Sequence, residues 1–331
     1  MGGRWRHRLL FSALTLALAP SLLRCANERG AHFDVGSGDT SSAVVPDAGR
    51  GDATGSDAMA EQPCNGEARN CARPLNKLVF PTSHNAMSSA ADGWLLPNQP
   101  HGIRAQLDAG ITGMMLDVHT AQGLDGIADG TPLLCHGICQ AGKRDLVEAF
   151  GDIRAWLLEH PRTVLVFVIE DHVAPQVIDA ALVQSQLRPL CIEHATGTPW
   201  PTLGALIAQN RRILLMLESG NGQQPWNHAY AKAAFDTPYE AKTAADFSCD
   251  VLRGQKGNDF FVINHFLTDG LSGHAALSKQ VNFNPLLADR VTACELKQGQ
   301  RANLIAVDWY APGDVLALAA AKNAAPQDGD P

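Results

Sequence analysis

The chain alternates apolar runs with amphipathic segments from about residue 64 onward. Seven apolar runs have the length and composition of strands: residues 78–82, 113–118, 132–135, 163–169, 211–217, 260–264 and 303–307. Several are unbroken, as in residues 164–169, where six apolar side chains follow one another. Such runs are typical of parallel strands that are covered on both faces. The pattern therefore predicts a parallel sheet.

Segments with helical spacing lie between these runs. They cover residues 145–160, 175–187, 203–210 and 285–296. In the first segment, Leu146, Ala149, Phe150, Ile153 and Leu157 fall on one face, and Pro161 follows its end. Strand and helix repeated in this order indicate a parallel α/β fold, and seven or eight strands favour a TIM barrel.

The N-terminus has the pattern of an export signal within residues 1–25. Arg4, Arg6 and Arg8 precede an apolar stretch at residues 9–18, and a small-x-small site ends at Ala19. Lipoprotein processing at Cys25 is the alternative to cleavage after Ala19. We therefore expect an exported protein that is secreted, periplasmic or lipid-anchored at the cell envelope.

The composition changes after the signal. Residues 26–63 are rich in Gly, Ser, Asp and Ala with little apolar content, so they predict a disordered tether. The predicted barrel occupies residues 64–325, and a tail follows at 326–331. The net charge of -8 argues against nucleic acid as a partner, and we expect a monomer.

The cysteines fit an oxidising compartment. Pairs that can form disulfides are Cys64 with Cys71, Cys135 with Cys139, and Cys249 with Cys294, which leaves Cys25 and Cys191 over. One sequence does not determine connectivity. Zinc binding by the Cys135-x3-Cys139 pair is the rival interpretation, although no second pair has a matching spacing.

Polar or ionisable residues follow almost every predicted strand. They are His84 and Asn85, Asp117 and His119, His136, Glu170 and Asp171, Glu218, Asn264 and His265, and Asp308. The carboxyl ends of parallel barrel strands meet at one face of the fold, where barrels carry their active sites. The series therefore predicts a site at that face.

The residue types indicate acid–base chemistry on a phosphate ester. His84 and His136 can exchange protons near neutral pH. Asn85, Asp117 and Glu170 supply hard oxygen atoms, which favour calcium or magnesium over zinc or copper. A divalent cation beside two histidines suits the cleavage of a phosphodiester, where negative charge develops on the phosphoryl oxygens.

Four motifs in order resemble the X domain of phosphatidylinositol-specific phospholipase C, and most closely the exported PLC-like phosphodiesterases. The motifs are residues 82–86 (TSHNA), 110–117 (GITGMMLD), 134–137 (LCHG) and 169–171 (IED). Supporting features are residues 64–66 (CNG), 97–99 (PNQ) and 303–310 (NLIAVDWY). The resemblance runs from about residue 64 to about residue 320.

This resemblance implies a distorted TIM barrel and a two-histidine mechanism. His84 would activate the inositol 2-hydroxyl or stabilise the transition state, and His136 would protonate the departing diacylglycerol oxygen. A cyclic inositol phosphate would result. Asp308 matches a late-strand aspartate that partners the first histidine. The substrate would be a phospholipid or another phosphodiester at a membrane surface.

The resemblance also implies calcium, held by the positions of Asn85, Asp117 and Glu170 and by one further carboxylate. Met115 stands where that carboxylate is expected, and His119 or Asp171 would have to compensate for it. In the metal-independent branch an arginine occupies the position of Asp117, and this chain has none there.

Two alternatives to this function stay open. Glycerophosphodiester phosphodiesterases share the barrel but carry His-Arg after the first strand and Glu-x-Glu or Glu-x-Asp on the second, where this chain has His84-Asn85 and Met115-x-Asp117. A catalytically lapsed module that binds a head-group at the surface is the other alternative, and Met115 favours it.

Overall fold

The computed structural model describes residues 62–195, 197–220, 222–268 and 274–327. These residues belong to one compact unit that runs from Thr54 to Pro331. The predicted signal peptide, Cys25 and residues 26–61 of the predicted tether lie outside the described residues.

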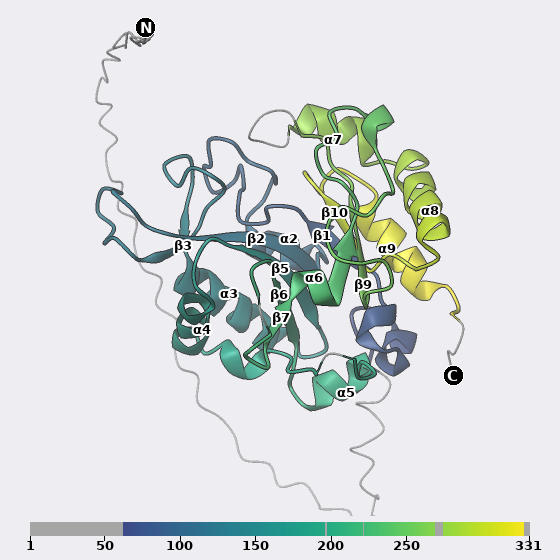
Figure 1. The fold of residues 1–331 in the computed structure, drawn as a ribbon, viewed down its shortest axis with the longest axis horizontal. Coiled ribbons are helices and arrows are strands. Elements are labelled where there is room, and N and C mark those ends of the chain that lie inside the picture. The colour runs from purple at the N-terminus through teal and green to yellow at the C-terminus, as the bar shows by residue number, and fades with distance from the viewer. Residues whose placement is uncertain (1–61, 196, 221, 269–273, 328–331) are drawn as a thin grey trace, which may run out of the picture. The chain divides into compact units, whose positions relative to one another are not determined.

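Eight parallel strands follow one another around the sheet in the order of the chain (Figure 1). They are β1 (Phe80–Ser83), β2 (Gly113–Thr120), β5 (Leu165–Asp171), β6 (Ile213–Leu217), β7 (Asn227–Ala229), β8 (Ala234–Asp236), β9 (Phe260–Asn264) and β10 (Leu304–Val307). The first strand pairs with the last, β10, as well as with β2. Circular order with first-to-last pairing is the topology of a TIM barrel.

The barrel is open at one seam. The sheet path runs from β7 at one edge to β8 at the other, and the two strands are consecutive in the chain. Only α6 (Tyr230–Ala233) separates them, and its four residues rise about 6 Å. Such a short connection holds the two edges close together, so the sheet curls round on itself. The predicted distorted TIM barrel is confirmed.

Side chains alternate along each strand between the barrel interior and the outer helices, so the core consists of two apolar layers. Met115 on β2 faces the barrel interior together with Val168 and Met216. Met114 and Leu116, its neighbours, pack instead against the helices outside. Those helices are α2 (Ile103–Asp108), α3 (Leu146–Glu159), α4 (Pro175–Gln184), α5 (Leu203–Ala208), α7 (Ala275–Val281), α8 (Leu286–Gln298) and α9 (Val315–Ala324). Short 3₁₀ turns occupy Ala68–Ala72, Leu75–Lys77, Arg188–Leu190 and Ala244–Asp246.

Helix α3 illustrates how the sequence defines an element boundary. The Asp145 carboxylate accepts hydrogen bonds from the backbone N–H of Val147 (2.8 Å) and Glu148 (3.0 Å). An N-cap of this kind satisfies backbone donors that have no partner within the helix. The predicted segment 145–160 therefore matches the observed helix closely.

One predicted barrel strand is not part of the barrel. β3 (Pro132–Leu134) runs antiparallel to β2 and pairs with β4 (Arg144–Asp145), so it forms a hairpin at the edge of the site. The connection from β2 to β3 contains no helix, whereas a parallel pairing needs a long crossover. Conversely, β7 and β8 were not predicted, because each has only three residues.

Three disulfides link the pairs Cys64–Cys71, Cys135–Cys139 and Cys249–Cys294. Zinc binding by Cys135 and Cys139 is therefore excluded, because both thiols are joined in a disulfide. Cys191 is a free, buried thiol in the described part of the chain. None of the described helices is both long and apolar enough to cross a bilayer.

Candidate active site

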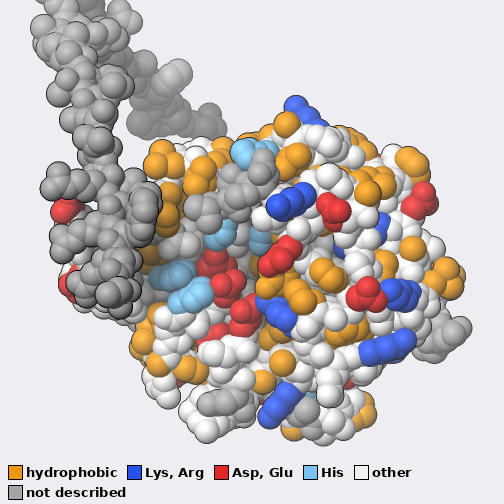
Figure 2. Space-filling model, turned by 45° about the horizontal axis from the view of Figure 1, so that its top comes forward, with side chains coloured by type: hydrophobic (Ala, Val, Ile, Leu, Met, Phe, Trp, Pro, Cys, Tyr) orange, Lys and Arg blue, Asp and Glu red, His pale blue; other side chains and the backbone are white. Residues whose placement is uncertain are grey.

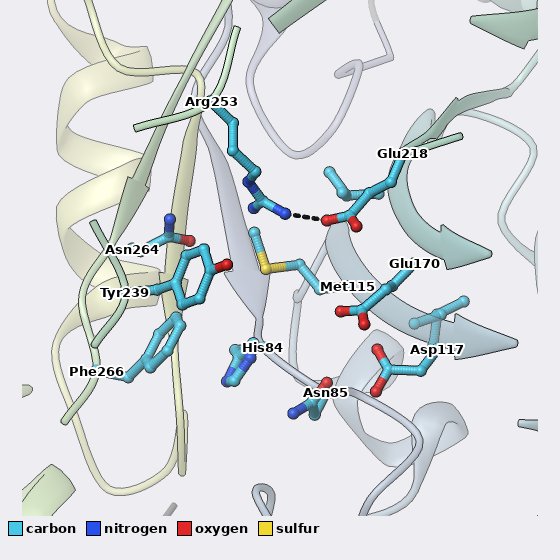
Figure 3. Close-up of a pocket in the computed structure, with 12 residues that line it drawn as sticks. His84, Asn85, Met115, Asp117, Glu170, Glu218, Tyr239, Arg253, Asn264 and Phe266 are labelled. Atoms are coloured by element: carbon cyan, nitrogen blue, oxygen red, sulfur yellow. Dashed lines mark hydrogen bonds and ion pairs between the residues drawn. The ribbon is translucent and has the colours of Figure 1, made fainter. Parts of the chain in front are cut away.

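Two adjoining cavities open at the carboxyl ends of the strands, one of about 220 Å³ and one of about 350 Å³. They share the lining residues His84, Asn85, Asp117, Glu170, Tyr239 and Phe266 (Figure 3). The smaller cavity extends to Met115, Glu218, Arg253 and Asn264. The larger one extends to Asn98, His119, His136, His172 and Asp308. The predicted catalytic residues and the predicted metal ligands therefore line one continuous region: His84, His136, Asp308, Asn85, Asp117 and Glu170.

His84 and Asp308 form a dyad. Ser83 pairs in register with Val307, so the residues that follow each strand lie side by side. The His84 Nδ1 and Asp308 Oδ1 atoms are 2.9 Å apart, and Asp308 is only 2% exposed. A carboxylate only accepts hydrogen bonds, so Nδ1 of His84 is the donor, and in the neutral ring Nε2 is left with a free lone pair. This is the tautomer that a general base needs.

Amide side chains hold the dyad in place. Asn98 Nδ2 donates to the same Asp308 oxygen at 3.2 Å. Gln99 Nε2 donates to the carbonyl oxygens of His84 (2.7 Å) and Val307 (2.9 Å), which belong to the two strand ends. Gln99, which belongs to the 97–99 segment that supported the resemblance, therefore holds the ends of β1 and β10 together at the site.

Strained backbone flanks the dyad on both sides. Asn85 and Trp309 each have φ of +46°, in the left-handed region. Asparagine tolerates this region, but a bulky residue such as tryptophan rarely adopts it. Backbone of this kind persists where surrounding contacts impose it, and it clusters at functional sites. The turns after β1 and β10 are therefore constrained to the conformation that presents His84 and Asp308.

An aromatic ring restrains His84 from the other side. The rings of His84 and Phe266 are parallel, with centroids 3.8 Å apart and an interplanar angle of 4°. Phe266 follows β9, so the imidazole is held between that strand end and Asp308. Stacking on an aromatic face also favours a protonated imidazole, the state reached when His84 accepts a proton.

His136 approaches the dyad from the hairpin rather than from a neighbouring barrel strand. It follows β3 and lies inside the five-residue ring that the Cys135–Cys139 disulfide closes. The side chain is half-buried, and burial, followed by the charge of His84, lowers the pKa of His136 below its usual range. The strand before His136 was predicted to belong to the barrel and instead forms the hairpin, yet His136 and His84 line the same cavity.

Three carboxylates form one row across neighbouring strands. Asp117 pairs in register with Glu170. Glu218 follows Leu217, the partner of Ile169, so it occupies the same row. Asp117 is only 5% exposed, and burial, then the charges of Glu170 and Glu218, raise its pKa well above the usual range. Burial and neighbouring carboxylates therefore favour the neutral form of Asp117, and a nearby positive charge would favour its ionised form.

The row directly beneath these carboxylates is apolar. Met115 pairs with Val168, and Val168 pairs with Met216. Met115 lines the smaller cavity between Arg253 and Glu170 (Figure 3). The Met115 thioether thus stands where the resemblance implies a further carboxylate ligand for calcium.

Asp171 and His119, the two residues suggested as substitutes for the carboxylate missing at Met115, both make other contacts. Asp171 accepts hydrogen bonds from the Ser219 backbone N–H (2.8 Å) and from its hydroxyl, so it is committed to the neighbouring strand end. His119 stacks on His172, with centroids 4.1 Å apart, and burial is the main cause of its lowered pKa. His172 Nε2 in turn lies 2.8 Å from Glu170 Oε1.

The chemistry of the lining residues fits a hard cation only in part. Asn85, Asp117 and Glu170 place oxygen-bearing side chains on one wall, and their carboxylates repel one another. Across residues 62–327, in the described ranges, no three His, Cys, Asp or Glu side chains converge as a preformed metal cluster. A cation here would need the Asn85 amide in addition to the two carboxylates.

A buried polar network closes the barrel seam beside the cavity. Arg253 donates to Asp236 at the end of β8 (Nε to Oδ2, 2.8 Å) and forms an ion pair with Glu218 after β6. Tyr230, directly after β7, donates its hydroxyl to the same Asp236 oxygen at 2.9 Å. Side chains therefore join the two edges where backbone pairing ends. No sequence pattern pointed to Arg253, which lies in the long connection between β8 and β9.

A second network supports β9 from behind. His265 is fully buried, its Nε2 lies 2.9 Å from the Val281 carbonyl oxygen, and Arg290 donates to its Nδ1 at 3.2 Å. Arg290 also donates to the Asn264 carbonyl oxygen at 2.7 Å. These contacts fix the strand end that carries Phe266.

The His265 environment predicts acid sensitivity. Burial, together with the Arg290 charge, lowers the pKa of His265 to about 3 from 6.5. The unfolded chain therefore binds the extra proton first, and stability decreases as pH falls from 6.5 towards 3, by up to about 1.4 kcal/mol per pH unit. Urea unfolding at several pH values measures this slope. His265→Gln, which does not titrate, should be less stable at pH 7 but should lose less stability in acid, and an unchanged slope would contradict the assignment.

The fold and the site define a parallel α/β barrel protein with histidines and carboxylates gathered at the carboxyl ends of its strands. The family model described as PI-PLC X matches residues 70–323 of the chain. The chain therefore belongs to the PI-PLC X family, as its sequence motifs predicted.

Two solved structures show a weaker likeness. The chain is similar to PLC21 of L. pealei, with 17% identity and a TM-score of 0.33 over 44% of this chain and 18% of that one. For PLC21 of S. officinalis the identity is 18% and the TM-score 0.35, over 46% of this chain and 19% of that one. The chain thus spans less than a fifth of the length of either structure. No curated protein matches it.

Proposed function

We propose that the protein is an exported phosphodiesterase of the phospholipase C type that cleaves a phospho-head-group by acid–base catalysis with two histidines. The observation that carries the proposal is the 2.9 Å contact between His84 Nδ1 and Asp308 Oδ1 in a cavity that His136 also lines. Membership of the PI-PLC X family supports it.

His84 is the general base. Its neutral imidazole takes the proton from the attacking hydroxyl of the head-group at Nε2, and the oxygen of that hydroxyl bonds to phosphorus. Asp308 then faces an imidazolium and stabilises it, while Phe266 keeps the ring in plane. Because Asn98 and Gln99 hold both partners, little reorganisation is needed during the step.

His136 is the general acid. As the bond from phosphorus to the leaving oxygen breaks, protonated His136 donates its proton to that oxygen and releases an alcohol. The products are a cyclic phosphate of the head-group and, for a glycerolipid, diacylglycerol. Burial and the charge of His84 lower the pKa of His136 in the ligand-free protein. The role as general acid therefore requires the negative charge of the bound phosphate to favour the protonated imidazole.

Calcium is the cofactor that we propose for this site, with Asn85, Asp117 and Glu170 as its ligands. Calcium prefers six to eight oxygen ligands, so these residues supply only part of its shell. When bound, it would neutralise the carboxylate row and offset the negative charge that develops on the phosphate. Burial, followed by the charges of Glu170 and Glu218, raises the pKa of Asp117, and a bound cation would favour the ionised form of this carboxyl group.

Export rests on the N-terminal pattern and is supported by the three disulfides, which are typical of proteins that fold in oxidising compartments. Met115 stands where a further metal ligand is expected. Its presence favours one rival function, a module that binds a head-group without cleaving it.

A vesicle assay distinguishes the two functions. Phosphatidylinositol vesicles incubated with the purified protein and calcium should release diacylglycerol and a cyclic inositol phosphate. Saturable vesicle binding without either product would support the binding module and contradict the proposed activity. Turnover of glycerophosphodiesters with no action on the inositol lipid would instead assign the barrel to the other phosphodiesterase class.

A further inference from the structure

Four histidines line the larger cavity, and they are held in place in different ways. Histidines and carboxylates gather in one area of the face seen in Figure 2. His84 is fixed by the dyad carboxylate at 2.9 Å, and His119 and His172 stack on each other. Among the described residues, the fourth imidazole, that of His136, has no partner in a hydrogen bond, ion pair or ring contact. The position of His136 therefore depends mainly on its backbone.

The turn that carries His136 is exposed on its outer side. Residues 137, 138 and 140 are exposed, with Ile138 at 52%. Gly137 has φ of +65°, and a Cβ placed on it would meet no atom within 4 Å. The Ile138 N–H donates to the His136 carbonyl oxygen at 2.7 Å, a bond that shapes the turn without attaching it to the barrel. Packing from outside therefore restrains the turn little.

Backbone contacts attach the turn to the rest of the protein only at its two ends. Before it, the Cys135 N–H donates to the Asp117 carbonyl oxygen at 3.3 Å. After it, the Leu95 N–H donates to the carbonyl oxygen of Ala141 at 2.8 Å. Strand β3 contributes just three residues of ladder before His136. The restraint that a long parallel ladder gives to His84 and its neighbours is therefore weaker here.

The Cys135–Cys139 disulfide supplies a restraint between these two ends. Cys135 is fully buried, and Cys139 packs against a small apolar cluster that includes Ala121 and Leu124. The bond closes a ring of five residues, in which His136 follows directly on the buried cysteine. A cross-link between two residues restricts the conformations of the chain between them. The disulfide thus joins an otherwise open turn to the core on both sides of the imidazole.

We propose that Cys135 and Cys139 are positioning residues for the general acid, because their disulfide holds the His136 imidazole where it can reach the leaving oxygen. The inference rests on the proposed function and gives this disulfide a role in turnover as well as in stability. Proton transfer depends on close alignment, and a displacement of about 1 Å can lower a rate by about a hundredfold. The base, in contrast, is aligned by Asp308 and Phe266 and does not depend on this bond.

The first test removes one disulfide at a time. In Cys135→Ser/Cys139→Ser, kcat on phosphatidylinositol vesicles should fall by about tenfold to a hundredfold with KM unchanged, because the displaced acid acts only in the transition state. The matched control is Cys64→Ser/Cys71→Ser, which opens another short ring that lines neither cavity and should keep the wild-type kcat. Equal losses in the two variants, or none in the first, would overturn the inference.

A double-variant cycle shows whether the loss passes through His136. In the His136→Ala protein the Cys135→Ser/Cys139→Ser change should alter kcat by less than about twofold, because the acid is already absent. On a substrate that releases a nitrophenolate, the same change should cost less than about twofold even when His136 is present. A further tenfold loss in the His136→Ala protein, or an undiminished defect on the nitrophenolate substrate, would mean that the disulfide does not act through the acid.

A second variant covers the case in which the serine pair does not fold. One glycine inserted after Gly137 keeps the disulfide but lengthens its ring, and exposed turns of this kind tolerate insertion. Its kcat should fall by at least about tenfold. One glycine inserted after Gly126, in the exposed loop between β2 and β3, leaves the ring unchanged and should leave kcat unchanged. Wild-type kcat in the first insertion variant would contradict the positioning role.

NMR relaxation measures the restraint without any turnover. The order parameter of the His136 backbone amide should be near about 0.85 in wild-type protein and below about 0.6 in Cys135→Ser/Cys139→Ser. Equal order parameters in the two proteins would overturn the inference. If wild-type protein cuts no lipid, the proposed catalysis fails, whereas the order parameters still decide whether the disulfide holds His136.

Discussion

Replacing His136 with alanine is expected to lower kcat on phosphatidylinositol vesicles by about 10³-fold to 10⁴-fold, the upper part of the range for the loss of a general acid or base. His84→Ala should cause a loss of similar size. The exposed His101 lies outside both cavities, so His101→Ala is the matched control and should retain wild-type activity. Full activity in either active-site variant would refute the assigned role.

A change of leaving group separates the two histidines. A substrate that releases a nitrophenolate needs little protonation of the departing oxygen, so the defect of His136→Ala should shrink by at least about tenfold on it. The defect of His84→Ala should remain, because the attacking hydroxyl still has to lose its proton. Equal recovery of both variants, or of neither, would contradict the division into acid and base.

Removal of calcium is expected to have the second-largest effect. Chelation should reduce turnover by at least about a hundredfold, because the carboxylate row then faces the substrate phosphate without compensation. Readdition of calcium should restore the rate. Unchanged turnover in the presence of the chelator would contradict the calcium proposal. The two-histidine mechanism would then act without a metal.

Asp117→Asn tests the proposed ligand directly. The amide removes a charge from the most buried member of the row, so the calcium concentration for half-maximal activity should rise by at least about tenfold, and calorimetry should show the same loss of calcium affinity. Asp125→Asn, in the exposed loop between β2 and β3, changes net charge equally and should have no effect. Identical calcium dependence in both variants would rule out Asp117 as a ligand.

Much of the site could be predicted because parallel strands carry their polar residues to a common face. His84, Asp117, Glu170 and Asp308 each follow a run of apolar residues, and a barrel has only one face where such strand ends meet. The location of these residues therefore followed from local patterns, without any knowledge of the loops. Their chemical roles remain predictions.

The parts that escaped prediction depend on direction and on distance along the chain. Hydrophobic periodicity does not distinguish a parallel from an antiparallel strand, so β3 was assigned to the barrel. Three-residue strands such as β7 and β8 are too short to leave a periodic pattern. Arg253 contacts Asp236 at a sequence separation of 17, and only the folded chain reveals this contact.

The open seam between β7 and β8 makes the width of the cavity depend on side chains as well as on backbone pairing. In a fully closed barrel, widening the mouth would break a ladder of backbone hydrogen bonds, whereas here the edges meet through Arg253, Glu218, Asp236 and Tyr230. Asp236 is fully buried, so opening this network would leave a carboxylate unpaired in a dry environment. One ion-pair network therefore sets the width of the cavity at the seam, whereas the dyad lies on strands that backbone pairing joins directly.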